Sequence, residues 1–151
     1  MQGSTPPIRI VVVDEDRDRA LTIVDGLREA FADADVSMIA EMTGLARRVA
    51  EIEADVVLVD LASPSRDSLE QAAAAAGPME RPVAMFVDAS DAELTRAAID
   101  AGVSAYVVDG LRKERIKPIV EMAVSRFHAV ARLRAELSAT KAALAERKTA
   151  Y

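Results

Sequence analysis

Carboxylates lie where two short apolar runs of the sequence end. Residues 8–13 are followed by Asp14 and Glu15, and residues 56–59 are followed by Asp60. If both runs are buried parallel strands, their carboxyl ends meet at one edge of a sheet and bring these side chains together. Hard divalent cations bind clustered carboxylate oxygens, and phosphoryl groups bind to such cations in turn. The spacing therefore predicts an acidic pocket for a cation; the alternative is separate, solvated carboxylates at strand ends.

The elements that would position these carboxylates alternate along the chain. Continuous apolar runs indicate strands that are buried on both faces, and three- and four-residue apolar spacing between the runs indicates helices. Gly77-Pro78 and Gly102 are typical of helix ends, and Ser90 with Glu93 three residues later is typical of a helix-starting capping box. The five apolar runs are residues 8–13, 36–40, 56–59, 83–87 and 105–108.

This alternation predicts an α/β fold, a (βα)5 doubly wound parallel sheet with right-handed crossovers. The expected arrangement is flavodoxin-like, with strand order 2-1-3-4-5. Ligands of such sheets bind beyond the carboxyl ends of the strands, at the switch point between strands 1 and 3. Asp14, Glu15 and Asp60 fall at that point, so the fold and the acidic pocket are consistent with each other.

The last helix is expected to begin near Arg115 and to continue to the end of the sequence. Its apolar residues first allow packing on the sheet and then, beyond Phe127, follow a heptad spacing that is typical of a parallel coiled coil. We therefore expect a homodimer through this helix; the alternative is a single exposed helix. The predicted organisation is a lead-in at 1–7, a globular domain at 8–127 and a helical extension at 128–151. The dimer positions are Val130, Leu133, Leu137 and Leu144.

Composition excludes several classes of function. The 151 residues are 51% hydrophobic and 3% aromatic, which supports an aliphatic core and disfavours base stacking on aromatic side chains. Cysteine is absent, so disulfides and thiolate sites are excluded, and no apolar run reaches the length of a membrane span. We expect a cytoplasmic protein. Residues 1–110 carry a net charge of −12 and residues 111–151 a net charge of +6. The basic residues of the second segment either lead toward a nucleic-acid-binding module or are ordinary solvated charges on a helix.

Three segments together resemble the receiver domain of two-component response regulators, over roughly residues 8–127. They are Val-Val-Asp14-Glu15-Asp16, Leu-Val-Asp60-Leu-Ala-Ser-Pro64 and Ala101-Gly-Val-Ser-Ala-Tyr106. The resemblance implies a regulatory module rather than an enzyme, with Asp60 as the phosphoacceptor of a histidine kinase. It also implies that Mg²⁺ binds Asp14, Glu15, Asp60 and the carbonyl of Ala62. The cation would relieve the repulsion between a carboxylate and an incoming phosphoryl group.

Two positions depart from the receiver pattern. Val87 stands where a Ser or Thr normally contacts the phosphoryl group, and Asp109 stands where a Lys normally does. With Asp88 and Tyr106 these are the expected switch positions, although Asp109 is also compatible with a simple Asp-Gly turn. Two like charges about 4 Å apart repel by about 4 kcal/mol at an effective dielectric of 20. A metal or a protonated carboxyl group is therefore expected in the pocket.

The departures themselves resemble a narrower family, the NasT-type regulators with an atypical receiver. The segment Ala-Gly-Val-Ser-Ala-Tyr-Val-Val-Asp-Gly-Leu and the tail from Leu133 to Lys148 carry this resemblance. It implies transcription antitermination by an ANTAR domain, an RNA-binding module that would begin near the end of these residues. RNA binding would then need that missing domain, and a ligand-sensing partner protein would replace the kinase.

Two other functions stay open on the sequence alone. The first is a conventional receiver that is phosphorylated at Asp60 with Mg²⁺. The second is a flavodoxin-like enzyme or cofactor carrier. No Gly-rich phosphate loop follows the first strand, where Asp16-Arg-Asp-Arg19 stands instead, and this disfavours a nucleotide cofactor.

Overall fold

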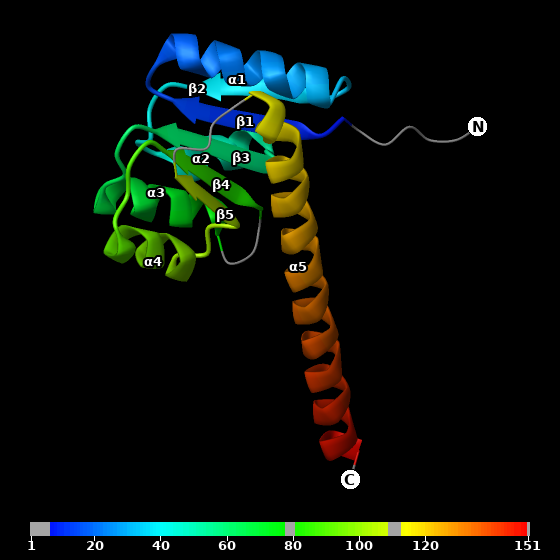
Figure 1. Cartoon of the computed structure of the whole chain (residues 1–151). Coiled ribbons are helices and arrows are strands. Elements are labelled where there is room, and N and C mark those ends of the chain that lie inside the picture. Colours follow the sequence, from blue (N-terminus) through cyan, green and yellow to red (C-terminus); the bar gives the residue numbers. More distant parts are fainter. Residues whose placement is uncertain (1–6, 78–80, 109–112, 151) are drawn as a thin grey trace, which may run out of the picture.

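The computed structural model describes residues 7–77, 81–108 and 113–150 (Figure 1). The side chains of residues 113, 126, 130, 131 and 148–150 lie outside this description. Five strands alternate with five helices, as the sequence predicts. The elements are β1 (Arg9–Asp14), α1 (Arg17–Ala30), β2 (Asp35–Ile39), α2 (Leu45–Ile52), β3 (Val56–Leu61), α3 (Arg66–Ala76), β4 (Val83–Val87), α4 (Ala92–Asp100), β5 (Ala105–Val108) and α5 (Lys113–Ala150).

The strands form one parallel sheet in the order β2-β1-β3-β4-β5. This confirms the predicted flavodoxin-like topology. The chain order reverses between β1 and β3, so the crevice at the carboxyl ends of these two strands is the switch point. The register places Asp14 of β1 directly beside Asp60 of β3.

Helices cover both faces of the sheet, which explains the continuous apolar runs in the strands. Val11 and Val13 face one side and pack with residues of α2, α3 and α4. Ile10 and Val12 face the other side and pack with α1 and the first half of α5. Figure 1 shows the same three layers, with α1 and α5 on the face opposite α3 and α4.

Polar side chains cap the N-termini of α1, α3 and α4. Asp16 accepts the N–H groups of Asp18 and Arg19 at the start of α1, and Ser65 and Ser68 form a reciprocal capping box at the start of α3. The capping box predicted at Ser90 is wrong, because Asp91 is the N-cap of α4 and accepts the N–H of Leu94. The Ser90 hydroxyl instead lies 2.7 Å from the hydroxyl of Tyr106.

Helix α5 is much longer than the other helices, with 38 residues from Lys113 to Ala150. Its first turns bury Ile116, Val120 and Ala123 against the sheet. Beyond this packing the helix projects away from the globular body (Figure 1), as the sequence predicts. Leu133, Leu137 and Leu144 are 64%, 56% and 52% exposed there. In the part of the chain that the structure describes, no helix is both long and apolar enough to cross a membrane.

Candidate functional site

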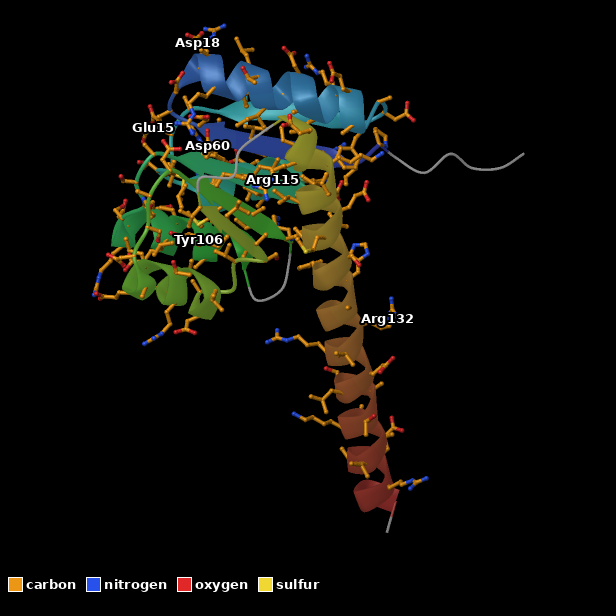
Figure 2. The ribbon with its side chains drawn as sticks, viewed as in Figure 1. Glu15, Asp18, Asp60, Tyr106, Arg115 and Arg132 are labelled. Atoms are coloured by element: carbon orange, nitrogen blue, oxygen red, sulfur yellow. The ribbon has the colours of Figure 1, made fainter. Side chains whose placement is uncertain are left out.

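Asp14 and Asp60 meet at the carboxyl ends of β1 and β3. Their Cα atoms are register partners in the parallel ladder, and the two residues are only 6% and 2% exposed. Figure 2 shows Asp60 and Glu15 at the same end of the sheet. The convergence follows from the parallel pairing, since strands that run together also end together. The structure thus places side by side two of the three carboxylates, Asp14, Glu15 and Asp60, that the sequence analysis expects in one pocket.

One buried oxygen of each carboxyl group has no hydrogen-bond donor among the described residues. Asp14 Oδ1 accepts the N–H of Asp16 at 2.9 Å, whereas Asp14 Oδ2 and Asp60 Oδ2 have no hydrogen-bond donor among the described residues. Ionised carboxylates only accept hydrogen bonds, so two of them side by side need a proton or a cation between them. Burial, a hydrogen bond with Asp14 and the charge of Asp14 raise the pKa of Asp60 to about 8.

The raised pKa of Asp60 favours one shared proton on the Asp14–Asp60 pair near neutral pH when no cation is bound. Protonated Asp60 can donate through Oδ2 to Asp14 and still accept through Oδ1. These same two oxygens, Asp14 Oδ2 and Asp60 Oδ2, would hold Mg²⁺ if the ion replaced the proton. When bound, Mg²⁺ would supply the positive charge that lets a carboxylate approach a phosphoryl group.

A guanidinium group from α1 closes the pocket on its open side. Arg19 Nη2 lies 2.9 Å from Asp60 Oδ1 and 3.3 Å from Asp88 Oδ1, and Arg19 Nη1 lies 3.2 Å from Asp88 Oδ2. The Arg19 side chain is 34% exposed and Asp88 is 54% exposed, while Asp60 is buried. The charge of Arg19 lowers the pKa of Asp60, but burial and Asp14 outweigh it.

The other two predicted metal ligands, Glu15 and Ala62, both line one hollow. Glu15 is exposed and lines this hollow of about 400 Å³ with Glu41, Asp67 and several hydroxyl side chains. The Ala62 carbonyl accepts the N–H groups of Asp88 at 3.1 Å and Ala89 at 3.3 Å. Within the described ranges, no group of three or more His, Cys, Asp and Glu side chains has the geometry to hold a metal ion.

The predicted switch positions surround the β4–α4 connection. Val87 is buried at the end of β4 and Asp88 follows it, bonded to Arg19. Tyr106 in β5 is half-buried, and its hydroxyl lies 2.7 Å from the Ser90 hydroxyl. The connection is thus tied to α1 at Asp88 and to β5 at Ser90. Asp109 lies outside the described residues.

Arg19 is the site residue that the sequence analysis missed. In the sequence, the Asp-Arg-Asp-Arg run indicates only that no Gly-rich phosphate loop follows the first strand. A local signal was present, however, because Asp16 as N-cap fixes the first turn of α1 beside the end of β1. Arg19 lies in that first turn, and a side chain as long as arginine can reach from there to the end of β3.

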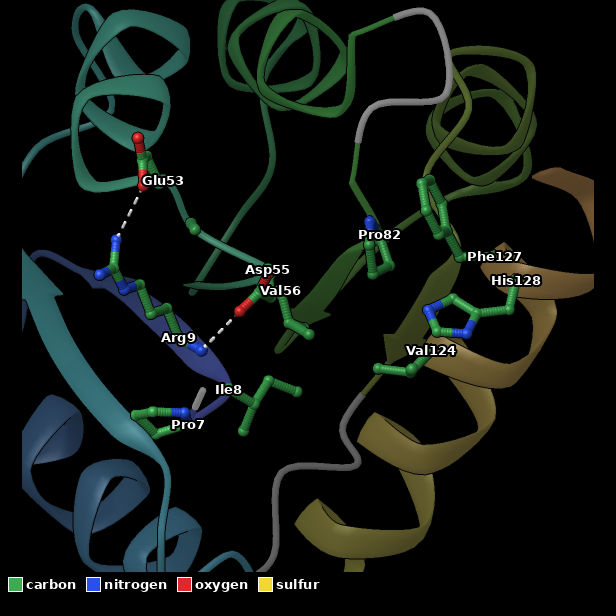
Figure 3. A pocket seen from close by; sticks show the side chains of 11 residues that line it. Pro7, Ile8, Arg9, Glu53, Asp55, Val56, Pro82, Val124, Phe127 and His128 are labelled. Carbon is green, nitrogen blue, oxygen red and sulfur yellow. Dashed lines mark hydrogen bonds and ion pairs between the residues drawn. The ribbon is translucent and has the colours of Figure 1, made fainter. Parts of the chain in front are cut away.

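A second hollow of about 670 Å³ lies at the opposite, amino-terminal edge of the sheet (Figure 3). Arg9 closes one side of it through an ion pair with Glu53 at 3.2 Å and a backbone N–H bond to Asp55 at 2.8 Å. Phe127 and His128 of α5 line the other side. This hollow shares no residue with the Asp14–Asp60 pair.

Comparisons with known proteins show what the fold of the chain is similar to. No model of a known protein family matches the chain. In solved structures, the signal receiver domain of a modulated diguanylate cyclase from Desulfovibrio desulfuricans aligns with a TM-score of 0.69 and 20% identity, covering 82% of this chain and 98% of that one. A response regulator from Thermotoga maritima aligns with a TM-score of 0.66 and 20% identity, covering 79% and 98%. The fold is that of a receiver domain.

One curated protein is similar in sequence as well. The transcriptional regulatory protein PdtaR of Mycobacterium tuberculosis is 32% identical over 94 residues, which are 62% of this chain and 46% of PdtaR. The match thus spans about half the length of that relative. In the receiver fold of this chain, Asp60 stands at the end of the third strand, where the sequence resemblance places the phosphoacceptor.

Proposed function

We propose that the chain is an atypical response-regulator receiver module that controls transcription antitermination through partner binding and dimerisation. The observation that carries this proposal is the buried Asp14–Asp60 pair at the switch point of a receiver fold. Such a pair, with two oxygens that lack donors among the described residues, has no evident packing role. The 32% identity with PdtaR, a transcriptional regulatory protein, supports output at the level of transcription.

The surroundings of Asp60 favour control by a partner protein over ordinary phosphorylation. Val87 offers no hydroxyl group to a phosphoryl oxygen, and Arg19 already bonds Asp60 Oδ1. A sensor protein that binds the β4–α4 connection would shift the population of two arrangements of Arg19 and Asp88. Contact with RNA would reside in an ANTAR domain outside these residues.

Dimerisation through α5 would connect this site to the output. Leu133, Leu137 and Leu144 leave an apolar stripe exposed on the projecting half of the helix. A heptad stripe of this kind is stable when a second helix covers it. The side chain of Val130, the first predicted position of the stripe, lies outside the described residues.

A small-molecule phosphodonor tests the proposal. The chain is incubated with acetyl phosphate and Mg²⁺, and its intact mass is compared with that of Asp60→Asn treated in the same way. We expect no lasting addition of a phosphoryl mass to the wild-type chain. An addition that Asp60→Asn abolishes would overturn the atypical assignment.

The second candidate is a conventional receiver that is phosphorylated at Asp60 by a histidine kinase. The specific observation in its favour is the pair of buried oxygens, Asp14 Oδ2 and Asp60 Oδ2, which suit Mg²⁺. The mass experiment separates the two candidates, because only the conventional receiver gains the phosphoryl group.

A further inference from the structure

Arg19 joins three parts of the chain that are distant in sequence. Its guanidinium extends from the first turn of α1 to Asp60 at the end of β3 and to Asp88 after β4. The two nitrogens Nη1 and Nη2 both contact Asp88, at 3.2 and 3.3 Å, and Nη2 also contacts Asp60 at 2.9 Å. A planar fork with this geometry binds carboxylates more specifically than a lysine ammonium does.

The guanidinium of Arg19 places a positive charge among the carboxylates of the pocket. Asp14, Asp60 and Asp88 surround it, and all three raise the pKa of Arg19 through their charges. Asp60 is buried, so its contact with Arg19 is shielded from water and salt more than the contact with exposed Asp88. A positive charge is therefore already in place at the mouth of the pocket, where an incoming cation would have to compete with it.

Asp88, whose side chain Arg19 holds, is also bonded through its backbone to the Ala62 carbonyl, a predicted metal ligand. Asp88 and Ala89 donate their N–H groups to the Ala62 carbonyl, and Asp88 is the residue that Arg19 holds. The Ala62 carbonyl and the start of the β4–α4 connection are thus fixed in one closed arrangement with Arg19.

We propose that Arg19 is the resident counter-ion of the Asp14–Asp60 pocket. A divalent cation enters only when the guanidinium leaves Asp60, and its departure frees Asp88 and the start of the β4–α4 connection. The exposed part of the Arg19 side chain provides a path for this movement into solvent. The inference describes the regulation of the proposed signalling site and rests on that proposed function.

Mn²⁺ binding tests this role directly. Free Mn²⁺ is measured by electron paramagnetic resonance during titration of the wild type, Arg19→Gln and Arg17→Gln. The two variants lose the same charge two residues apart, but Arg17 is an exposed residue at the start of α1. We expect Arg19→Gln to bind Mn²⁺ at least about tenfold more tightly than the wild type, which corresponds to about 1.4 kcal/mol. Arg17→Gln should stay within about twofold of the wild type.

Two further measurements show whether the gain arises in this pocket. Asp60→Asn in the Arg19→Gln background should remove the tight Mn²⁺ site. In amide NMR spectra, the Asp88 and Ala89 signals of the wild type should move on saturation with Mg²⁺ toward their positions in metal-free Arg19→Gln. Circular dichroism checks that each variant is folded, and Arg19→Lys, which keeps the charge but not the fork, should bind Mn²⁺ with intermediate affinity.

The inference and the proposed function fail in different ways. Equal Mn²⁺ affinity in the Arg19 and Arg17 variants, with binding that depends on Asp60, would overturn the role of Arg19 alone. No binding that depends on Asp60 in any variant would overturn the cation pocket and the role of Arg19, whereas the proposed function is overturned only by the phosphodonor experiment.

Discussion

At the residue scale, Asp60 is held in surroundings that suit its neutral form better than its charged form. It is buried beside Asp14, and the single guanidinium of Arg19 is shared with Asp88. The pKa of Asp60 is therefore raised from 3.8 to about 8. A carboxyl group that changes charge near neutral pH, at the switch point of the sheet, is sensitive to any cation or partner that approaches it.

This raised pKa predicts how stability depends on pH. The folded chain keeps a proton on Asp60 that the unfolded chain loses above about pH 4, so the stabilisation is present in acid and is lost as pH rises toward 8. The free energy of unfolding should fall by up to about 1.4 kcal/mol per pH unit from this group in metal-free buffer. Urea unfolding at several pH values between 5 and 9 measures this slope.

Asp60→Asn provides the comparison for that slope. The amide is isosteric with the protonated carboxyl group, and it can donate to Asp14 while its oxygen accepts from Arg19. The variant should be at least as stable as the wild type at pH 8 and should lose most of the slope. Asp25→Asn, an exposed change on α1, should keep the slope, and an equal slope in both variants would contradict the buried position of Asp60.

The hydroxyl contact between Tyr106 and Ser90 gives a second test at this scale. The 2.7 Å contact links β5 to the β4–α4 connection, and Tyr106 is half-buried. Tyr106→Phe removes one hydrogen bond and should lower the free energy of unfolding by about 1 kcal/mol. Ser90→Ala should cost a similar amount, and the double variant should cost less than the sum of the two. Additive losses in chemical denaturation would contradict the contact.

The sequence predicted the meeting of Asp14 and Asp60, because parallel strands that end in carboxylates leave little freedom in where those carboxylates lie. It did not predict Arg19, since a long side chain with several rotamers can reach many partners from one backbone position. Glu15 shows the opposite case. Its neighbour Asp14 is the last residue of β1 and is buried, whereas Glu15 lies in the bend after the strand and is exposed to solvent.

At the element scale, side-chain caps fix the helix starts near the site. Ser65 and Ser68 cap α3 reciprocally, with Oγ–N distances of 3.0 Å from Ser68 N and 2.7 Å from Ser65 N. Ser65→Ala should lower the free energy of unfolding by about 1 kcal/mol. Thermal unfolding measures the loss, and Ser63→Ala, at an exposed residue outside the helix, is the control. Equal effects of the two changes would contradict the cap.

Helix α5 makes a prediction about association. Leu137 is 56% exposed and belongs to the heptad stripe with Leu133 and Leu144. Leu137→Asp places a charge in the centre of the expected interface, so it should convert a dimer into a monomer in multi-angle light scattering. Ala139→Asp changes an outer position of the same heptads and should leave the dimer intact. A wild-type monomer, or a dimer that survives Leu137→Asp, would contradict the coiled coil.

Strand and helix positions were well predicted, because a strand covered on both faces has an unmistakable apolar run. The start of α4 was not, since Ser90 and Asp91 are both good N-cap residues and only the fold decides between them. Tyr106 of β5 lies within reach of Ser90, which leaves Asp91 to cap the helix. Such a choice depends on a contact between residues that are distant in sequence.

At the scale of the whole molecule, five strand–helix repeats were sufficient to predict the sheet order, because crossover handedness and buried strands allow few arrangements. The receiver fold then fixes where a ligand must bind, at the carboxyl ends of β1 and β3. The fold alone does not determine whether a cation, a phosphoryl group or a partner protein acts there. That choice depends on a few side chains, with Arg19 foremost among them.

The central claim is that Asp14 and Asp60, from strands far apart in sequence, share one buried pocket. Carbon-13 NMR of aspartate side-chain carboxyl groups tests it most directly, with metal-free wild type and Asp60→Asn titrated from pH 3 to 9. The account predicts one carboxyl signal that titrates near pH 8, in line with the raised pKa of Asp60, and that is missing from Asp60→Asn. An Asp60 signal that titrates near pH 4, as an exposed aspartate does, would contradict it.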